Sequence, residues 1–77
     1  MNKSRRDRLS KANELLEEAK NIIEEVKDEE QESFDNLSEG LQQTEKNQQM
    51  EENASSLDDV FTDIETSISS IQEVIDK

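Results

Sequence analysis

The side chains of this chain that could do chemistry are almost all carboxylates. The 77 residues include 21 Asp and Glu but no His, Cys, Tyr or Trp, so the thiol and imidazole groups used in nucleophilic catalysis and zinc binding are absent. Carboxylates act as catalytic acids or bases where a partly dry, concave site shifts their pKa values. A chain this short does not easily enclose such a site. The sequence therefore predicts a protein that is not an enzyme and needs no cofactor or metal.

The densest group of carboxylates lies before the middle of the chain, and we predict that a partner binds there. One interpretation is a solvated helix face that keeps the protein soluble. A second is a surface that imitates the phosphate spacing of nucleic acid and occupies the basic groove of a protein. A calcium loop over residues 28–39 is disfavoured, because Ser33 stands where an EF-hand needs glycine. The predicted partner-binding residues are Glu25, Asp28, Glu29, Glu30, Glu32, Phe34, Asp35 and Leu37.

The charge balance narrows the class of partner. A net charge of −12 argues against direct binding to nucleic acid or to anionic membranes, and favours a basic protein. The basic run from Lys3 to Arg8 is not followed by an apolar segment. We therefore expect neither a signal peptide nor a transmembrane helix, and a cytoplasmic location.

Two heptad patterns predict an all-α fold. In each, apolar residues recur at alternating steps of three and four, as at the a and d positions of a coiled coil. We expect one hairpin domain over 1–77, with helices over about 5–34 and about 44–76 and a joint over about 35–43. Ser4 and Thr44 are expected to cap the long helices, and Asn36 to begin a short turn that Gly40 ends. The patterns are Leu9, Ala12, Leu16, Ala19, Ile23 and Val26, then Met50, Ala54, Leu57, Phe61, Ile64, Ile68, Ile71 and Ile75.

A lone antiparallel hairpin leaves some of these apolar residues exposed to water. Doubling the hairpin into a four-helix bundle covers them, so a homodimer is predicted, with a higher oligomer as the alternative. The basic start of the first helix is expected to form ion pairs with Asp63, Glu65, Glu73 and Asp76 at the end of the second. The predicted oligomer seam is Leu15, Ile22, Val60, Ile64, Ile68, Ile71 and Val74.

The stretch from Asp28 to Gln42, followed by Met50-Glu51-Glu52, resembles a recurrent segment in small acidic hypothetical proteins of bacteria and their phages. Where this chain has Ser38, those proteins often carry Pro. The resemblance implies no catalytic motif and favours a phage or prophage accessory protein that inhibits a host protein, acting in the host cytoplasm. Two other functions stay open: a structural assembly coiled coil, and an oligomeric sponge that traps a small ligand between chains.

Overall fold

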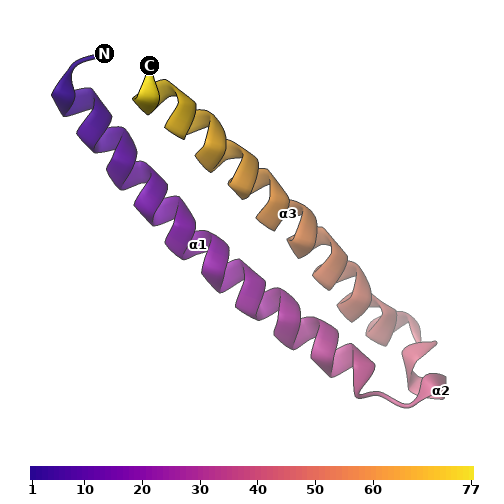
Figure 1. Cartoon of the computed structure of the whole chain (residues 1–77). Helices are drawn as coiled ribbons and strands as arrows, with labels where there is room; N and C mark the ends of the chain where they lie inside the picture. Colours follow the sequence, from indigo (N-terminus) through magenta and orange to yellow (C-terminus); the bar gives the residue numbers. More distant parts are fainter.

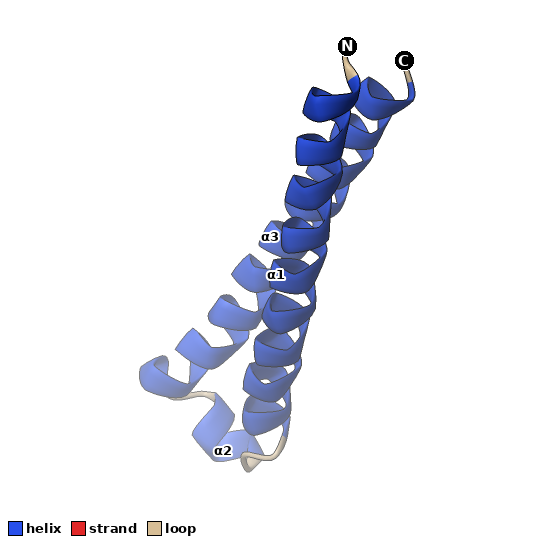
Figure 2. Cartoon of the chain, turned by 90° about the vertical axis from the view of Figure 1, so that its left-hand side faces the viewer, coloured by secondary structure: helices blue, strands red, loops and turns tan.

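The computed structural model describes all 77 residues and consists of three helices joined by short turns. Helix α1 spans Lys3–Asp35, the single turn α2 spans Glu39–Gln42, and α3 spans Glu45–Asp76. The two long helices run antiparallel and side by side, so both termini lie at one end and α2 at the other (Figures 1 and 2). The molecule is a rod of 58 × 15 × 14 Å. The predicted all-helical hairpin is therefore confirmed.

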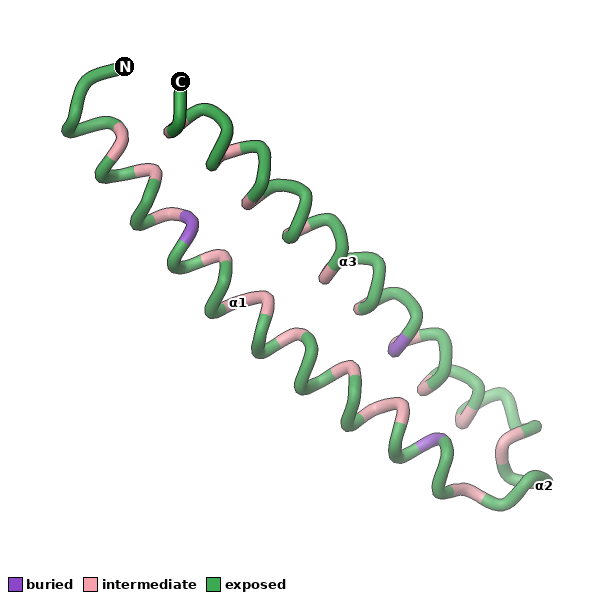
Figure 3. Tube along the Cα trace, in the orientation of Figure 1, coloured by how far each residue is buried: buried purple, intermediate pink, exposed green.

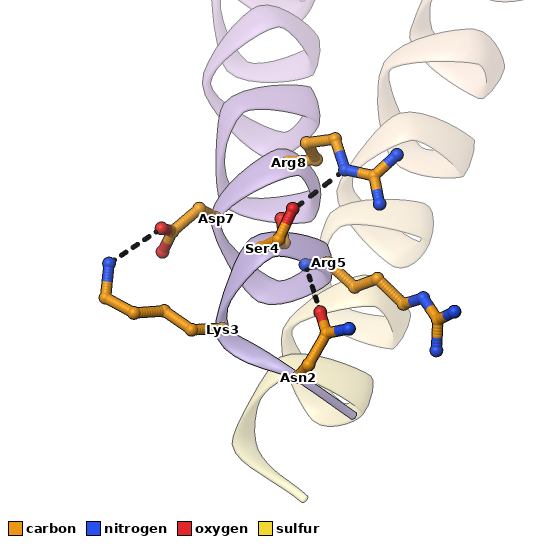
Figure 4. A network of polar contacts seen from close by, with 6 residues as sticks. All are labelled: Asn2, Lys3, Ser4, Arg5, Asp7 and Arg8. Atoms are coloured by element: carbon orange, nitrogen blue, oxygen red, sulfur yellow. Dashed lines mark hydrogen bonds and ion pairs between the residues drawn. The ribbon is translucent and has the colours of Figure 1, made fainter.

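The ends of the long helices are fixed by side-chain caps. The Oδ1 atom of Asn2 accepts a hydrogen bond from the backbone N–H of Arg5 at 2.9 Å, so α1 begins before the predicted cap Ser4 (Figure 4). The hydroxyl of Thr44 accepts from the N–H of Asn47 at 3.3 Å, which confirms the predicted cap of α3.

The joint differs from its prediction in detail. Asn36 ends α1, and the hydroxyl of Ser38 caps α2 by accepting from the N–H of Leu41 at 3.4 Å. Gly40 lies inside α2 with a negative φ, so it does not end an element there. The side chain of Gln42 donates to the carbonyls of Phe34 and Leu37 at 3.2 Å each, which ties α2 back to the end of α1. These amide contacts satisfy carbonyls that the end of α1 leaves without helical partners.

The face that α1 turns toward α3 is wider than predicted. Besides predicted apolar residues, the half-buried or buried positions from Arg6 to Phe34 include Asn13, Lys20 and Lys27. Asn13 donates from Nδ2 to the carbonyl of Ile68 at 3.2 Å, and Lys27 pairs with Asp58 at 3.4 Å. The prediction was correct for Leu9, Ala12, Leu16, Ala19 and Ile23, all of which are half-buried, but wrong for Val26, which is 46% exposed.

Lysine is suited to this face because its stem is apolar and its charge lies at the tip. The ammonium groups of Lys20 and Lys27 lie 5.3 and 5.8 Å from the centre of the Phe61 ring, one on each side of it along α1. Both side chains therefore cover Phe61 while their charged ends reach carboxylates at the edge. Alanine at either position would be too short to do so.

The interior of the hairpin is thin. Only Asn13, Phe34 and Ala54 are buried, at three separate points along the rod (Figure 3). Ile64, Ile68 and Ile71 are half-buried and share the heptad pattern of the buried Ala54, so these three predicted oligomer residues serve the contact between the two helices of one chain. The other four predicted oligomer residues, Leu15, Ile22, Val60 and Val74, are exposed.

Replacing Asn13 by leucine is expected to raise the free energy of unfolding by about 1–3 kcal/mol. The Oδ1 atom of Asn13 is buried without a hydrogen-bond partner, and that desolvation cost disappears with an apolar side chain. Urea unfolding followed by circular dichroism measures the change. The matched control is Asn21→Leu, the same change at an exposed site, which should shift stability by less than about 0.5 kcal/mol. A less stable Asn13→Leu variant would show that the polar contact with Ile68 outweighs the unsatisfied oxygen.

Candidate functional site

Carboxylates gather on one long side of the hairpin, around Lys20 and Lys27 of α1. Lys20 lies 2.9 Å from Glu17 of α1, and Lys27 lies 3.6 Å from Asp28 of α1 and 3.4 Å from Asp58 of α3. The hydrogen bond with Glu17 raises the pKa of Lys20, and that with Asp58 raises the pKa of Lys27. Both ammonium groups thus point to the same side, where carboxylates from both helices gather.

The acidic patch lies on the outer surface of α1 near the joint, and it contains most of the predicted partner-binding residues. All of its side chains are exposed. Only Asp28 forms an ion pair, with Lys27, so the other carboxylates stay unneutralised. Such a surface attracts a basic partner over several ångströms and raises the rate of encounter. The patch consists of Glu25, Asp28, Glu29, Glu32 and Asp35.

Two predicted partner-binding residues belong to the interior instead. Glu30 is half-buried, and its Oε2 atom accepts a hydrogen bond from the Nδ2 group of Asn53 at 3.0 Å, so it connects α1 to α3. Phe34 is only 8% exposed and closes the joint end of the hairpin, so its ring is not available to a partner. Leu37 is half-buried, whereas the neighbouring apolar residue Leu41 is 51% exposed.

The structure adds carboxylates from α3 that the prediction did not include. Asp58 reaches Lys27 and lines, with Asp28, a shallow groove between the two long helices. These carboxylates could have been predicted from the two heptad patterns, because an antiparallel hairpin places the start of α3 beside the end of α1. The exposed carboxylates in this half of α3 are Glu45, Glu51, Glu52, Asp58 and Asp59.

The carboxylates of the hairpin are not arranged as a cation-binding site. Residues 28–35 are a continuous part of α1, so the segment does not form a calcium-binding loop. No group of three acidic side chains converges closely enough to hold a metal ion. The carboxylates thus form an extended surface and not a coordination site.

The opposite long side of the hairpin is apolar. Ala12, Leu15, Ala19, Ile22 and Val26 form a stripe along α1 with its own steps of three and four. Helix α3 contributes Val60 and Val74, which occupy equivalent heptad positions, to the same side of the hairpin. The exposed fractions are 53% for Leu15, 60% for Ile22, 46% for Val26, 41% for Val60 and 40% for Val74. We call these seven residues the apolar side; exposed apolar side chains grouped on one side of a protein are a common feature of interaction sites.

The predicted ion pairs between the two ends of the chain do not form. Arg5, Arg6 and Arg8 have no carboxylate partner, and the one ion pair between the long helices is Lys27–Asp58. The Nε group of Arg8 donates to the backbone carbonyl of Ser4 at 3.4 Å (Figure 4), and the residue is exposed. The α1 arginines therefore remain free for a partner.

Comparison of the chain with protein-family models, with curated proteins and with solved structures finds no match. None of the three helices combines the length and the apolar character needed to cross a lipid bilayer.

Proposed function

We propose that this chain is a non-catalytic, homo-oligomeric binding protein whose acidic patch engages a basic protein. The observation that carries the proposal is the division of the rod into two long sides, one rich in carboxylates and one apolar. An apolar side that joins copies leaves the carboxylates outside, where a partner reaches them. The oligomer is a dimer in the form of a four-helix bundle, the smallest assembly that covers the apolar side.

The acidic patch suits a groove that normally binds nucleic acid. Its carboxylates lie along several turns of one helix, and a helix places successive turns 5.4 Å apart. A rigid row of negative charges competes with a phosphate backbone without any chemistry of its own. In its specific form the proposal is a phage or prophage accessory protein that inhibits a host defence or nucleic-acid-binding protein in the cytoplasm. The phage origin is supported by the resemblance of the joint segment alone.

Reversing the charge of four patch residues tests this function. A variant with Glu25, Asp28, Glu32 and Asp35 changed to Lys is expected to bind the basic partner roughly 10–100-fold more weakly, and the wild-type complex should weaken as salt is added. The measurement is capture of partner proteins from host lysate at low and high salt, followed by titration with the purified partner.

A matched control keeps the same change in net charge but moves it to the other end of the rod. It reverses Glu14, Glu18, Glu73 and Asp76, all of which are exposed. The control should bind the partner within about threefold of wild type, because exposed charges beyond a Debye length of ~8 Å are largely screened. Equal loss in both variants would mean that net charge, and not the acidic patch, governs binding. Unchanged binding in the patch variant would rule out the proposed surface.

The apolar side favours a second candidate function, a structural assembly protein. In that case self-association would be the whole activity, and the carboxylates would only maintain solubility. The patch variant distinguishes the two, because it would then assemble and function as wild type does.

A further inference from the structure

The apolar side is nearly symmetric about its own midpoint. On α1, Leu15 and Ile22 lie on either side of Ala19, and Ala12 and Val26 lie seven residues away from it in each direction. On α3, Val60 and Val74 each lie seven residues from Ser67. A two-fold axis requires such a symmetric surface, because the same patch of both copies must complement itself.

The two midpoints lie within about one and a half helical turns of each other along the rod. Asn13 donates a hydrogen bond to the carbonyl of Ile68, and Lys20 lies over the ring of Phe61. Ala19 falls between Asn13 and Lys20, and Ser67 falls between Phe61 and Ile68. Ala19 lies one residue from the Lys20–Phe61 contact and Ser67 one residue from the Asn13–Ile68 contact, so an axis midway between them passes within about one helical turn of both small residues.

We infer that the apolar side binds a second copy of this chain in one orientation, with the two hairpins antiparallel about a two-fold axis close to Ala19 and Ser67. This inference rests on the proposed homo-oligomer and gives it a geometry. Helix α1 packs on α1 of the second copy, and α3 packs on α3. The two joints lie at opposite ends of the bundle. Apolar residues then meet apolar residues: Leu15 lies opposite Ile22, Ala12 opposite Val26, and Val60 opposite Val74 of the second copy.

Charge complementarity selects this orientation. Arg8 and Glu29 flank the α1 stripe at nearly equal distances from Ala19, so the axis brings Arg8 of one copy beside Glu29 of the other, twice in the dimer. Arg8 has no carboxylate partner within its own chain, and Glu29 has no cation. Arginine and glutamate at the edge of an interface fix its register.

The other two-fold arrangement is a poor fit. It would keep both joints at one end and place α1 of one copy on α3 of the other. By the register of the Asn13–Ile68 and Lys20–Phe61 contacts, Arg8 would then lie opposite Val74 and Leu15 opposite Ser67. A charged side chain would face an apolar one, and Arg8 would lose its pairing with Glu29.

The area of the antiparallel contact is that of a stable dimer. The copies overlap along α1 from about residue 5 to about residue 33, or ~42 Å, and along α3 from about residue 58 to Asp76, or ~27 Å, and each helix is ~10 Å wide. Such a contact buries about 700 Å² on each copy, close to the usual size for a specific interface. Glu29 lies at the edge of this contact, whereas the other four residues of each acidic patch and both joints stay outside it, so each dimer offers two equivalent binding surfaces for partners.

Disulfide cross-linking tests the orientation directly, because the chain contains no cysteine of its own. Residues on a two-fold axis meet their own copies. A variant with Ala19→Cys alone, and a second with Ser67→Cys alone, are each expected to form a covalent dimer under mild oxidation. Mixed chains with Leu15→Cys and Ile22→Cys should cross-link to each other several times more than to themselves. The control, Asn21→Cys, is exposed on the carboxylate side and should remain monomeric in denaturing gels.

Two results would overturn the inference. Cross-linking of Ala19→Cys chains only to Ser67→Cys chains would show the arrangement with both joints at one end. A native mass of one chain at tens of micromolar protein would exclude the dimer itself. Neither result depends on the acidic patch, because partner binding is measured separately with the charge-reversal variants. The experiments therefore distinguish a wrong dimer orientation from a wrong proposed function.

Discussion

Replacing Phe34 by alanine is expected to lower the free energy of unfolding by about 3–5 kcal/mol. Phe34 is the only large side chain among the three buried residues, and it lies where α1 meets the joint. Its own carbonyl accepts hydrogen bonds from Leu37 at 3.1 Å and from the side chain of Gln42 at 3.2 Å. Loss of the ring would leave a cavity beneath these contacts, and α2 would lose its support.

Such a loss is comparable to the whole stability of a small domain, about 0.05–0.15 kcal/mol per residue. The melting temperature should therefore fall by more than about 12 °C, at a shift of about 4–8 °C per kcal/mol for a domain of this size. Thermal unfolding at one fixed protein concentration, followed by circular dichroism at 222 nm, is the measurement.

The control for Phe34→Ala is Leu41→Ala, which also removes a large apolar side chain from the joint. Leu41 is 51% exposed, so its removal should change stability by less than about 0.5 kcal/mol. Equal melting temperatures for the two variants would contradict the role of Phe34 as the residue that closes the hairpin.

The long helices could be predicted from the sequence because their apolar residues keep one period over many turns. Eight α3 positions from Met50 to Ile75 follow it without interruption, and every one of them is buried or half-buried in the structure. The absence of proline and the polar segment around Asn36 then left a hairpin as the simplest fold. Local rules also predicted the cap at Thr44, whose hydroxyl satisfies an N–H one turn later.

The face of α1 could not be predicted in the same way, because two stripes of this helix keep the heptad period. Leu9, Leu16 and Ile23 belong to both, and either the alanines or the polar residues Asn13, Lys20 and Lys27 complete the pattern. A count of apolar residues favours the alanines. Which residues face α3 depends on α3 itself. Its Phe61 ring is covered by the apolar stems of the two lysines, and its Asp58 carboxylate pairs with Lys27.

The same dependence explains the errors in the candidate site. Charge density along the chain located the acidic patch, since an exposed helix face is a local property. Whether Glu30 or Phe34 points outward depends instead on its position relative to α3, and Asn53 holds Glu30 at the contact. The ion pairs expected for the arginines fail for a similar reason. Opposite charges at one end of a hairpin do not pair unless their side chains point to each other.

Introducing glutamate at both Leu15 and Ile22 is expected to abolish self-association while leaving the hairpin folded. In a single chain these side chains are 53% and 60% exposed, so the substitutions cost the hairpin little. In a dimer closed through the apolar side, each copy would bring two unpaired carboxylates into a desolvated contact. The dissociation constant should rise by at least about 100-fold, or roughly 3 kcal/mol, because buried charges without partners oppose association strongly.

Sedimentation equilibrium over a range of protein concentrations measures this effect, and melting curves at a concentration where wild type is monomeric check the fold. The control variant carries Asn21→Glu and Thr62→Glu, which add the same charge at exposed sites away from the apolar side. It should dimerise within about threefold of wild type, because only exposed, screened charges are added. Wild-type dimerisation of the Leu15 and Ile22 variant would mean that the apolar side does not join the copies. Loss of helicity in the monomeric variant alone would mean instead that the stripe supports the hairpin, against its exposure in the structure.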